Sequence, residues 1–355
     1  MRVYYIGNRY DGCYYVRCLM PLVNNGWDGS KTSLRGSAAT PEQMTAGVLR
    51  SDVVVFQRPD CENKVAVIKL LKKAGKRIVF DNDDTYIPDS GVPTQMTSGD
   101  LELVLQKINT NLMEFVSQAD LVTTTTEFLA NEYRQYNSNV VVIPNMIDPD
   151  DWEEPIKNET SEVRIGLVGS VAANDDYQDI IPLLNELKKR DDVKIVLFSL
   201  PPLGKEYEKS RLLYKKEIDF WDQYDVEWHH FVPMHDYQDK LNTLALDIML
   251  IPRHDSYFNR CKSNLKFLEA AMLEVPCIAT SFADGNSPYD KDIDGKNGVL
   301  IKRKEDWITE TIRLIEDKDL REKMGKCAKK YVLTNYNVHD KAHLWRDAYQ
   351  SMYGN

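Results

Sequence analysis

Three charged side chains recur at helical spacing in the stretch from Asn259 to Thr280. Lys262, Lys266 and Glu269 follow one another at steps of four and three residues, which predicts that they share one face of an α-helix. Free N–H groups at a helix N-terminus, the helix dipole and lysine charge all attract an anion such as a diphosphate. Glu269 would accept hydrogen bonds from two vicinal hydroxyls of a ribose or sugar. An exposed, weakly stabilising Lys–Glu pair is the alternative interpretation.

The residues just before this helix add more positive charge. Arg253 follows an apolar run and Arg260 comes seven residues later, so four cations cluster between positions 253 and 266. Ser263 or Asn264 would cap the helix, and Pro276 would end it. This segment has the strongest phosphate-binding character in the chain.

A group of carboxylates follows the apolar run RIVF. Asp81, Asp83 and Asp84 would repel one another, a cost that is explained if they bind hydroxyls, a cation or a proton. Asp-x-Asp is also a metal-binding pattern of another class of sugar transferases, and a solvated turn is the plain alternative.

Two glycine-containing turns also follow apolar runs. Gly12 closes the segment GNRYDG, and Gly169 with Ser170 follows RIGLV. Backbone N–H groups at such turns suit a phosphate or a sugar hydroxyl. The GxGxxG fingerprint is absent, so no hydride-transfer cofactor is expected. Arg17, on the helix after the first turn, would either reach into a cleft or lie on the surface.

The histidines and cysteines give little further chemistry. His339 and His343 have zinc-like spacing, but without a third ligand nearby in the sequence a structural role is expected. The six cysteines form no CxxC pair and are expected to be reduced. No metal ion and no cofactor is expected.

Short apolar runs alternate with amphipathic stretches along most of the chain, which predicts parallel sheets with helices on both faces. The polar run 144–161 indicates a hinge between two domains. The expected strands are 3–6, 53–56, 78–80, 121–123 and 140–143, then 163–168, 194–198, 226–231, 248–251, 277–279 and 299–301. The expected helices include 14–25, 62–74, 100–117 and 127–136, and near the C-terminus 304–316, 318–333 and 340–352.

Composition limits the partners. A net charge of −10 argues against a nucleic-acid-binding surface spread over the whole protein. The basic stretch 64–77 would nevertheless dock on an anionic membrane or a nucleic-acid backbone, or form a solvated face. Because no apolar run is long enough for a membrane span and no signal-peptide core is visible, a cytoplasmic location is expected.

Several motifs match a known family. KSNLKFLEAAMLEV followed by PCIATSFADGNSPYDKDIDGKNGVLI resembles the donor-site segment of retaining GT-B glycosyltransferases of the family-four (group 1) type. The segments 120–123, 142–148 and 166–170 match as well, and the N-terminal GCYY and FDNDD segments resemble a bacterial and phage subgroup. The resemblance implies two Rossmann-like, doubly wound domains that face a cleft: residues 1–150 on the acceptor side and 160–335 on the nucleotide-sugar side. Helix 336–355 would pack back on the first domain.

The resemblance also assigns roles. Lys266 would contact the donor diphosphate, with Lys262 or Arg260 as helpers. Glu269 would bind the ribose hydroxyls, and Gly169 and Ser170 would approach the phosphate or the sugar. Asp81, Asp83 and Asp84 stand where many relatives have a cleft histidine that touches the transferred sugar, and Gly12 would lie across the cleft.

The chain departs from the family pattern at three places. Cys261 stands where the family has a glutamate that holds the donor sugar, Glu274 replaces a common glycine, and Ala173 or Asn174 replaces a histidine. The expected function is metal-independent hexosyl transfer from a nucleotide diphosphate-sugar to a hydroxyl of a glycan, a lipid-linked sugar or a modified DNA base. The alternatives are a GT-B-like epimerase or phosphorylase, and a sugar-nucleotide-binding protein that has lost catalysis.

Overall fold

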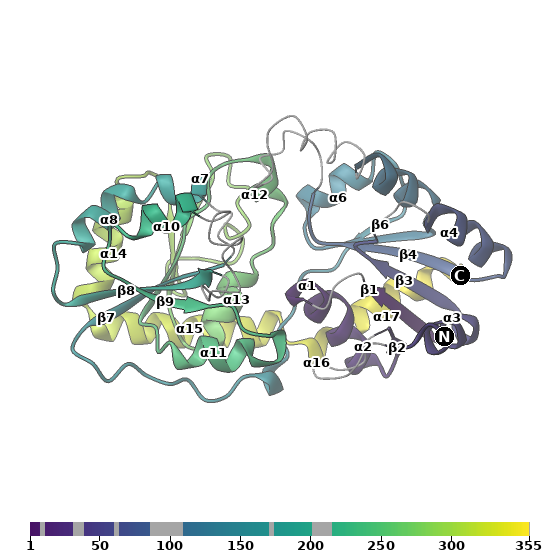
Figure 1. Ribbon diagram of the computed structural model, residues 1–355, viewed down its shortest axis with the longest axis horizontal. Helices are drawn as coiled ribbons and strands as arrows, with labels where there is room; N and C mark the ends of the chain where they lie inside the picture. Colours follow the sequence, from purple (N-terminus) through teal and green to yellow (C-terminus); the bar gives the residue numbers. More distant parts are fainter. Residues whose placement is uncertain are drawn as a thin grey trace.

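The protein consists of two α/β domains, arranged along the long axis of the molecule (Figure 1). The structure is a computed structural model that describes residues 1–7, 11–30, 39–59, 64–85, 109–169, 174–200 and 215–354. Each domain is built on a six-stranded sheet in which all strand pairs are parallel. The prediction of two Rossmann-like, doubly wound domains is therefore confirmed.

The N-terminal sheet has the strand order β2-β1-β3-β4-β5-β6. Its central strands are apolar on both faces because helices cover both, as in other parallel sheets. Its strands are β1 Val3–Gly7, β2 Asp28–Gly29, β3 Val53–Gln57, β4 Arg77–Asn82, β5 Leu121–Thr124 and β6 Val140–Val142.

The sequence predicted most helices of this domain but missed α3. It also missed the short strand β2. The α3 helix begins with a capping box in which Thr40 and Gln43 bond to each other's backbone. Of the predicted helix 100–117, residues 109–117 are helical and 100–108 lie outside the described residues. The helices are α1 Gly12–Tyr14, η1 Tyr15–Leu19, α2 Met20–Asn25, α3 Pro41–Arg50, α4 Lys64–Lys73 and α6 Glu127–Tyr133.

The C-terminal sheet has the order β12-β11-β10-β7-β8-β9. Every strand predicted from the sequence is present, with ends that differ by one or two residues. The strands are β7 Val163–Val168, β8 Val193–Leu200, β9 Val226–His230, β10 Ile248–Ile251, β11 Cys277–Thr280 and β12 Val299–Ile301.

Helices cover both faces of this second sheet and pack on two separate apolar clusters. They are α7 Asn174–Gln178, α8 Ile181–Leu187, α10 Lys215–Trp221, η5 Met234–Asp236, α11 Tyr237–Thr243, α12 Tyr257–Cys261, α13 Leu265–Met272, α14 Asp306–Glu316 and α15 Lys318–Asn335.

The chain crosses between the domains twice. The first crossing contains η3 Pro149–Asp151, and the second leads from α15 into α16 Val338–Lys341, α17 His343–Gln350 and η6 Ser351–Tyr353. Tyr349 is buried in the N-terminal core, where its hydroxyl lies 2.9 Å from that of Tyr5. The C-terminal helices thus pack on the first domain, where Figure 1 shows α17 beside β1. Among the described residues, no helix has the length and apolarity needed to span a bilayer.

Candidate active site

The segment that the sequence singled out is two helices, not one. Lys262 is extended, with φ −66° and ψ 156°, so α12 ends before it and α13 begins at Leu265. Lys262 therefore does not share a helix face with Lys266 and Glu269, and that prediction is wrong. The interruption turns the Lys262 side chain toward the N-terminal domain instead.

Lys266 and Glu269 form a compact cluster with Tyr237 of α11. The Lys266 Nζ atom lies 2.8 Å from Oε2 of Glu269 and 2.8 Å from the Tyr237 hydroxyl, which itself donates to Oε2 at 2.9 Å. Burial would lower the pKa of Lys266, but the Glu269 carboxylate and Tyr237 outweigh it and raise this pKa. The ammonium group therefore stays charged at neutral pH. Phe198 stacks on the Tyr237 ring at 5.6 Å and holds it in place.

The turn after β7 lies against this cluster. Gly169 has φ +151°, a conformation that residues with a Cβ atom rarely adopt. A Cβ atom built on Gly169 would lie 3.9 Å from Cε of Lys266, so the backbone of the turn lies beside the lysine. The two predicted donor-site positions, Gly169 and Lys266, are thus neighbours. Ser170 lies outside the described residues.

Arg253, which follows β10, is held by a second polar cluster. Its Nη1 atom donates to Asp176 at 2.9 Å, and Asn259 donates to the same carboxylate at 2.7 Å. Burial would lower the pKa of Arg253, but the Tyr289 hydroxyl and the Asp176 carboxylate outweigh it and raise this pKa. Arg253 therefore stays charged and is held between Asp176 and Tyr289.

Arg260 faces two carboxylates. It makes a two-point contact with Asp255, at 2.6 and 2.7 Å, and contacts Asp284 at 2.6 Å. Its guanidinium also lies over the Phe282 ring at 5.1 Å. Because two aspartates already neutralise it, Arg260 would have to exchange partners before it could contact a phosphate.

Lys262 connects the two domains. It forms an ion pair with Asp84, which follows β4 in the N-terminal domain and also pairs with Arg58. Arg58 contacts Asp83 as well, at 2.9 Å. Burial would raise the pKa of Asp83, but Arg58, a hydrogen bond from Cys13 and nearby cations hold it below its usual range. The predicted repulsion between these aspartates is thus relieved by arginine and lysine.

Asp81 is separate from this group and lies inside the protein. It is fully buried and forms a two-point ion pair with Arg17, at 2.7 and 3.1 Å, and also accepts a hydrogen bond from Thr123 at 2.7 Å. Arg17 is equally buried and donates to the Ile143 carbonyl at 2.6 Å. Neither side chain is available to a substrate, so Asp81 positions the strand end that carries Asp83 and Asp84.

Gly12 lies at the start of α1 and approaches the C-terminal domain, since a Cβ atom there would lie 3.7 Å from the sulfur of Met234. Sequence reasoning missed Tyr237, which has no motif of its own. Asp176 and Arg58 were missed as well. The one available signal for all three was their position after a strand of a parallel sheet.

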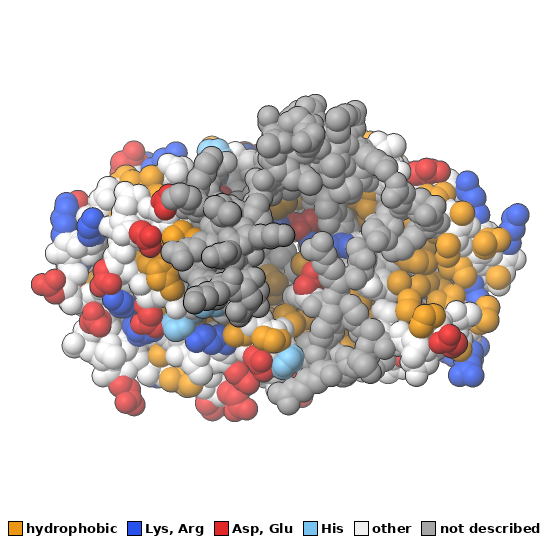
Figure 2. All heavy atoms as spheres, viewed as in Figure 1, with side chains coloured by type: hydrophobic (Ala, Val, Ile, Leu, Met, Phe, Trp, Pro, Cys, Tyr) orange, Lys and Arg blue, Asp and Glu red, His pale blue; other side chains and the backbone are white. Residues whose placement is uncertain are grey.

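The basic helix α4 lies at the far end of the N-terminal domain. Lys72 pairs with Asp120 at 2.9 Å, and Lys76 donates to two backbone carbonyls at 2.6 Å, so part of its charge is neutralised internally. Lys69 and Lys73 are exposed. Apolar side chains gather on the part of the surface that lies over α3 and α4 (Figure 2). Leu49 of α3 and Val67 and Leu70 of α4 are exposed, Leu70 by 66%.

Fold and geometry together define a two-domain protein of the GT-B class, in which Lys266, Glu269 and Tyr237 cluster beside the turn after β7 of the second domain. The family model "Glycosyl transferases group 1" matches residues 148–331, just over half of the chain. The chain belongs to this family. No curated protein matches the chain in sequence.

Solved structures of similar fold share little sequence with the chain. Sucrose-phosphate synthase from Thermosynechococcus elongatus superposes with a TM-score of 0.66 at 13% identity and covers 99% of both chains. HepE from Anabaena, in complex with UDP and glucose, gives 0.63 at 12% identity, with 98% of this chain and 99% of that chain covered. TarM from S. aureus, in complex with UDP, fondaparinux and α-GlcNAc-glycerol, gives 0.54 at 15% identity. That match covers 84% of this chain, which spans 55% of the TarM chain.

Proposed function

We propose that the protein transfers a sugar from a nucleotide diphosphate-sugar to a hydroxyl acceptor, with retention of the anomeric configuration. The observation that carries this proposal is the cluster of Lys266, Glu269 and Tyr237 beside the backbone of Gly169. One cation, one carboxylate and a close-approaching turn provide what a sugar nucleotide requires: charge for the diphosphate and an acceptor for vicinal hydroxyls.

In the unliganded protein Lys266 and Glu269 satisfy each other. A bound donor would replace this pair, with the diphosphate taking the Lys266 ammonium and the ribose hydroxyls donating to Glu269. Both groups are partly accessible, with side-chain exposures of 20% and 9%. The exchange gives the ammonium group an anion and the carboxylate two hydrogen-bond donors, so neither group is left buried without a partner.

Fixed cations stabilise the negative charge that develops on the leaving diphosphate, which is electrostatic preorganisation. Four cations are candidates, and each has a carboxylate partner that the diphosphate would replace: Lys266 pairs with Glu269, Arg253 with Asp176, Arg260 with Asp255 and Asp284, and Lys262 with Asp84. No metal ion is needed for this role. Because the donor phosphate can accept the proton of the acceptor hydroxyl, no strong protein base is required either.

Asp83 and Asp84 are candidates for contact with the transferred sugar or the acceptor. They directly follow β4 in the N-terminal domain, where Arg58, from the segment after β3, and Lys262, from the C-terminal domain, hold them through ion pairs. Carboxylates at this place suit sugar hydroxyls, which are their usual hydrogen-bond donors. Asp81, at the end of the same strand, is fixed by its buried ion pair with Arg17.

A lipid-linked sugar is the acceptor class that we favour. The α3–α4 face combines exposed aliphatic side chains (Leu49, Val67 and Leu70) with exposed Lys69 and Lys73. An anionic bilayer interacts favourably with both the aliphatic side chains and the lysines, whereas a nucleic-acid backbone interacts favourably with the lysines alone. In a flotation assay the protein should therefore move with anionic vesicles to the top of the gradient, and Leu70→Glu should abolish this co-flotation. Binding to duplex DNA without binding to vesicles would contradict this choice.

A second candidate is a protein that binds a sugar nucleotide without transferring the sugar. The observation behind it is Cys261, which stands in place of the family's glutamate and is buried in the apolar cluster of the N-terminal domain. Burial raises the pKa of this thiol, so it does not supply a negative charge in place of the carboxylate.

One assay separates the candidates. Purified protein is incubated with common UDP-, GDP- and ADP-sugars and with glycan or lipid-linked acceptors, and product mass and anomeric configuration are measured. The proposal predicts a product heavier by one sugar with retained configuration, unaffected by chelator, and a loss of kcat/KM of about 10² to 10³ in Lys266→Ala. Nucleotide binding without product would favour the second candidate. Activity lost with chelator and restored by manganese would contradict a metal-free mechanism.

A further inference from the structure

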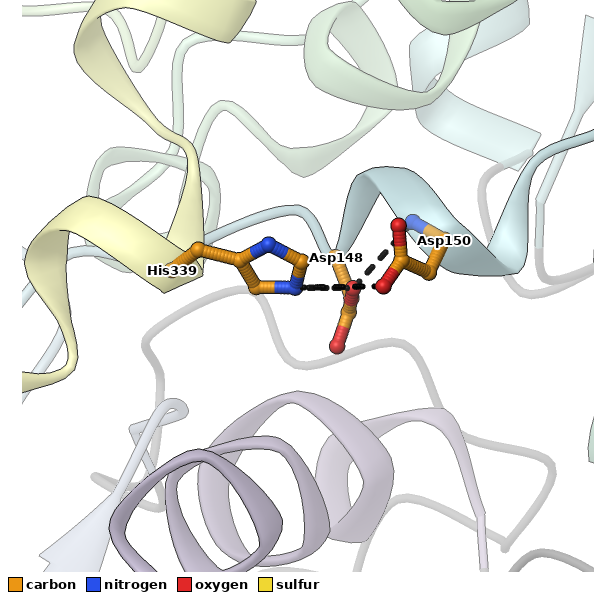
Figure 3. A group of neighbouring side chains, drawn as sticks. All are labelled: Asp148, Asp150 and His339. Atoms are coloured by element: carbon orange, nitrogen blue, oxygen red, sulfur yellow. Dashed lines mark hydrogen bonds and ion pairs between the residues drawn. The ribbon is translucent and has the colours of Figure 1, made fainter.

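Three metal-ligating side chains meet where the two interdomain crossings touch (Figure 3). The Nε2 atom of His339 lies 2.9 Å from Oδ1 of Asp148 and 3.7 Å from Oδ2 of Asp150. All three ligand atoms lie within 4.8 Å of one another. Asp148 and Asp150 belong to the first crossing and His339 to α16 on the second, so residues almost two hundred positions apart converge here.

The backbone holds these side chains in place. Ile147 and Asn337 form a parallel bridge, with hydrogen bonds from Ile147 N to Tyr336 O at 2.8 Å and from Val338 N to Ile147 O at 2.9 Å. These bonds fix the residues adjacent to Asp148 and His339. The donor atoms therefore converge on a rigid framework, which is what a metal site requires.

The donor set suits one class of ion. One imidazole nitrogen and two carboxylate oxygens are ligands of Zn²⁺, whereas Ca²⁺ and Mg²⁺ prefer oxygen alone. Ligands of a tetrahedral zinc ion at its usual bond lengths lie about 3.3 Å apart. The distances of 2.9 and 3.7 Å from His339 to the two aspartates bracket this value. Asp150 is 83% exposed, so its side chain can adjust and water can complete the coordination.

Local charge also favours a cation. Within the described part of the chain, His339 is the sole ion-pair partner of both Asp148 and Asp150, and it carries charge only when protonated. Asp151 adds a third carboxylate, which accepts a hydrogen bond from Tyr15. A divalent ion would offset the negative charge that these carboxylates gather at the crossing.

We propose that Asp148, Asp150 and His339 bind a Zn²⁺ ion that clamps the two interdomain crossings together. The site is separate from the donor cluster and does not depend on the sugar-transfer proposal. Its effect is on the stability of the crossing: an ion that binds the folded state alone raises the unfolding temperature, and the rise grows with the logarithm of the ion concentration once that exceeds Kd. His343, four residues on, does not belong to this group of converging ligand atoms.

Calorimetric titration of the metal-stripped, full-length protein with Zn²⁺ tests this site. Wild type and the control His343→Gln should each bind one equivalent, while His339→Gln and Asp150→Asn should bind at least tenfold more weakly. Zn²⁺ should raise the unfolding temperature of the first two proteins and not of the last two. Asp150→Asn removes an exposed side chain, so this variant should fold even if His339→Gln does not.

Two results would overturn the proposal. Equal binding by all four proteins would place the ion elsewhere, for example on a thiol. Absence of binding by wild type would mean that His339 and Asp148 form an ordinary ion pair.

Discussion

Lys262 of the C-terminal domain forms an ion pair with Asp84 of the N-terminal domain, and thereby joins the two sides of the candidate active site. The two side chains are 25% and 16% exposed, so the pair is only partly screened by water. Their contact ties the end of β4 in the N-terminal domain to the segment between α12 and α13 in the C-terminal domain. Four predictions follow from this pair and from neighbouring contacts.

The first prediction concerns coupling between Lys262 and Asp84. Because both substitutions remove one shared interaction, Lys262→Ala and Asp84→Ala together should cost less than the sum of their separate effects, by about 1 kcal/mol. Thermal unfolding of the single and double variants measures this difference. Lys157→Ala is the control, since Lys157 pairs with Glu274 within its own domain. Its effect should add to that of Asp84→Ala, and additivity for Lys262 as well would contradict the interdomain pair.

The second prediction concerns the buried pair of Arg17 and Asp81. Both side chains are fully buried, so Asp81→Ala would leave an arginine charge without a partner. Its cost should be about 3 to 5 kcal/mol in the free energy of unfolding. Asp192→Ala, which breaks the exposed pair with Arg190, should cost at most about 1 kcal/mol. Urea unfolding distinguishes them; a small cost for Asp81→Ala would mean that Asp81 is free for a direct role in catalysis.

The third prediction concerns pH and Glu132. This side chain is 1% exposed, and burial raises its pKa from 4.5 to about 7, although hydrogen bonds with Thr85 and Tyr257 oppose the shift. Between these two values the folded state keeps a proton that the unfolded state releases, so stability falls as pH rises. Below pH 4.5 both states hold the proton, and above about 7 the loss is complete.

Glu132→Gln cannot ionise and should lose this part of the pH dependence. Unfolding temperatures of wild type and variant, compared from pH 5 to 8, should therefore diverge in favour of the variant as pH rises. Parallel curves would show that Glu132 does not titrate in this range.

The fourth prediction separates backbone strain from donor binding. Gly169→Ala and Gly75→Ala both place a Cβ atom at positive φ, at +151° and +75°. Each should lower stability, by on the order of 1 kcal/mol. Only Gly169 lies beside Lys266, whereas a Cβ atom on Gly75 meets open space. Calorimetry should thus show weaker nucleotide binding for Gly169→Ala alone, and equal binding by the two variants would remove Gly169 from the site.

Sequence periodicity was sufficient to predict most strands of both sheets, because buried parallel strands are apolar on both faces and differ clearly from amphipathic helices. It missed β2, whose two residues, Asp28 and Gly29, carry no strand pattern. It also merged α12 with α13. The residues around Lys262 fit a helical repeat equally well, and the extended conformation of Lys262 accompanies a contact with Asp84, 178 residues away.

The candidate site was predictable where neighbours are close in sequence and not where the fold brings distant residues together. Lys266 and Glu269 meet one helical turn apart, as their spacing implied. Tyr237, which completes their cluster, comes from another helix and has no motif. Glu274, in place of the family's glycine, has φ +55°, so the structure gives a reason for that glycine that one sequence alone does not contain.

The most direct test of the donor site is calorimetric binding of UDP, GDP and ADP to wild type, Lys266→Ala and Glu269→Ala. Lys189→Ala is the matched control, since Lys189 belongs to an exposed pair with Glu186 at the same spacing of three residues. One nucleotide should bind wild type and the control with equal affinity and bind the two site variants at least tenfold more weakly. If folded wild type binds none of the three, or binds one no more tightly than Lys266→Ala does, the cluster around Lys266 is not a donor site.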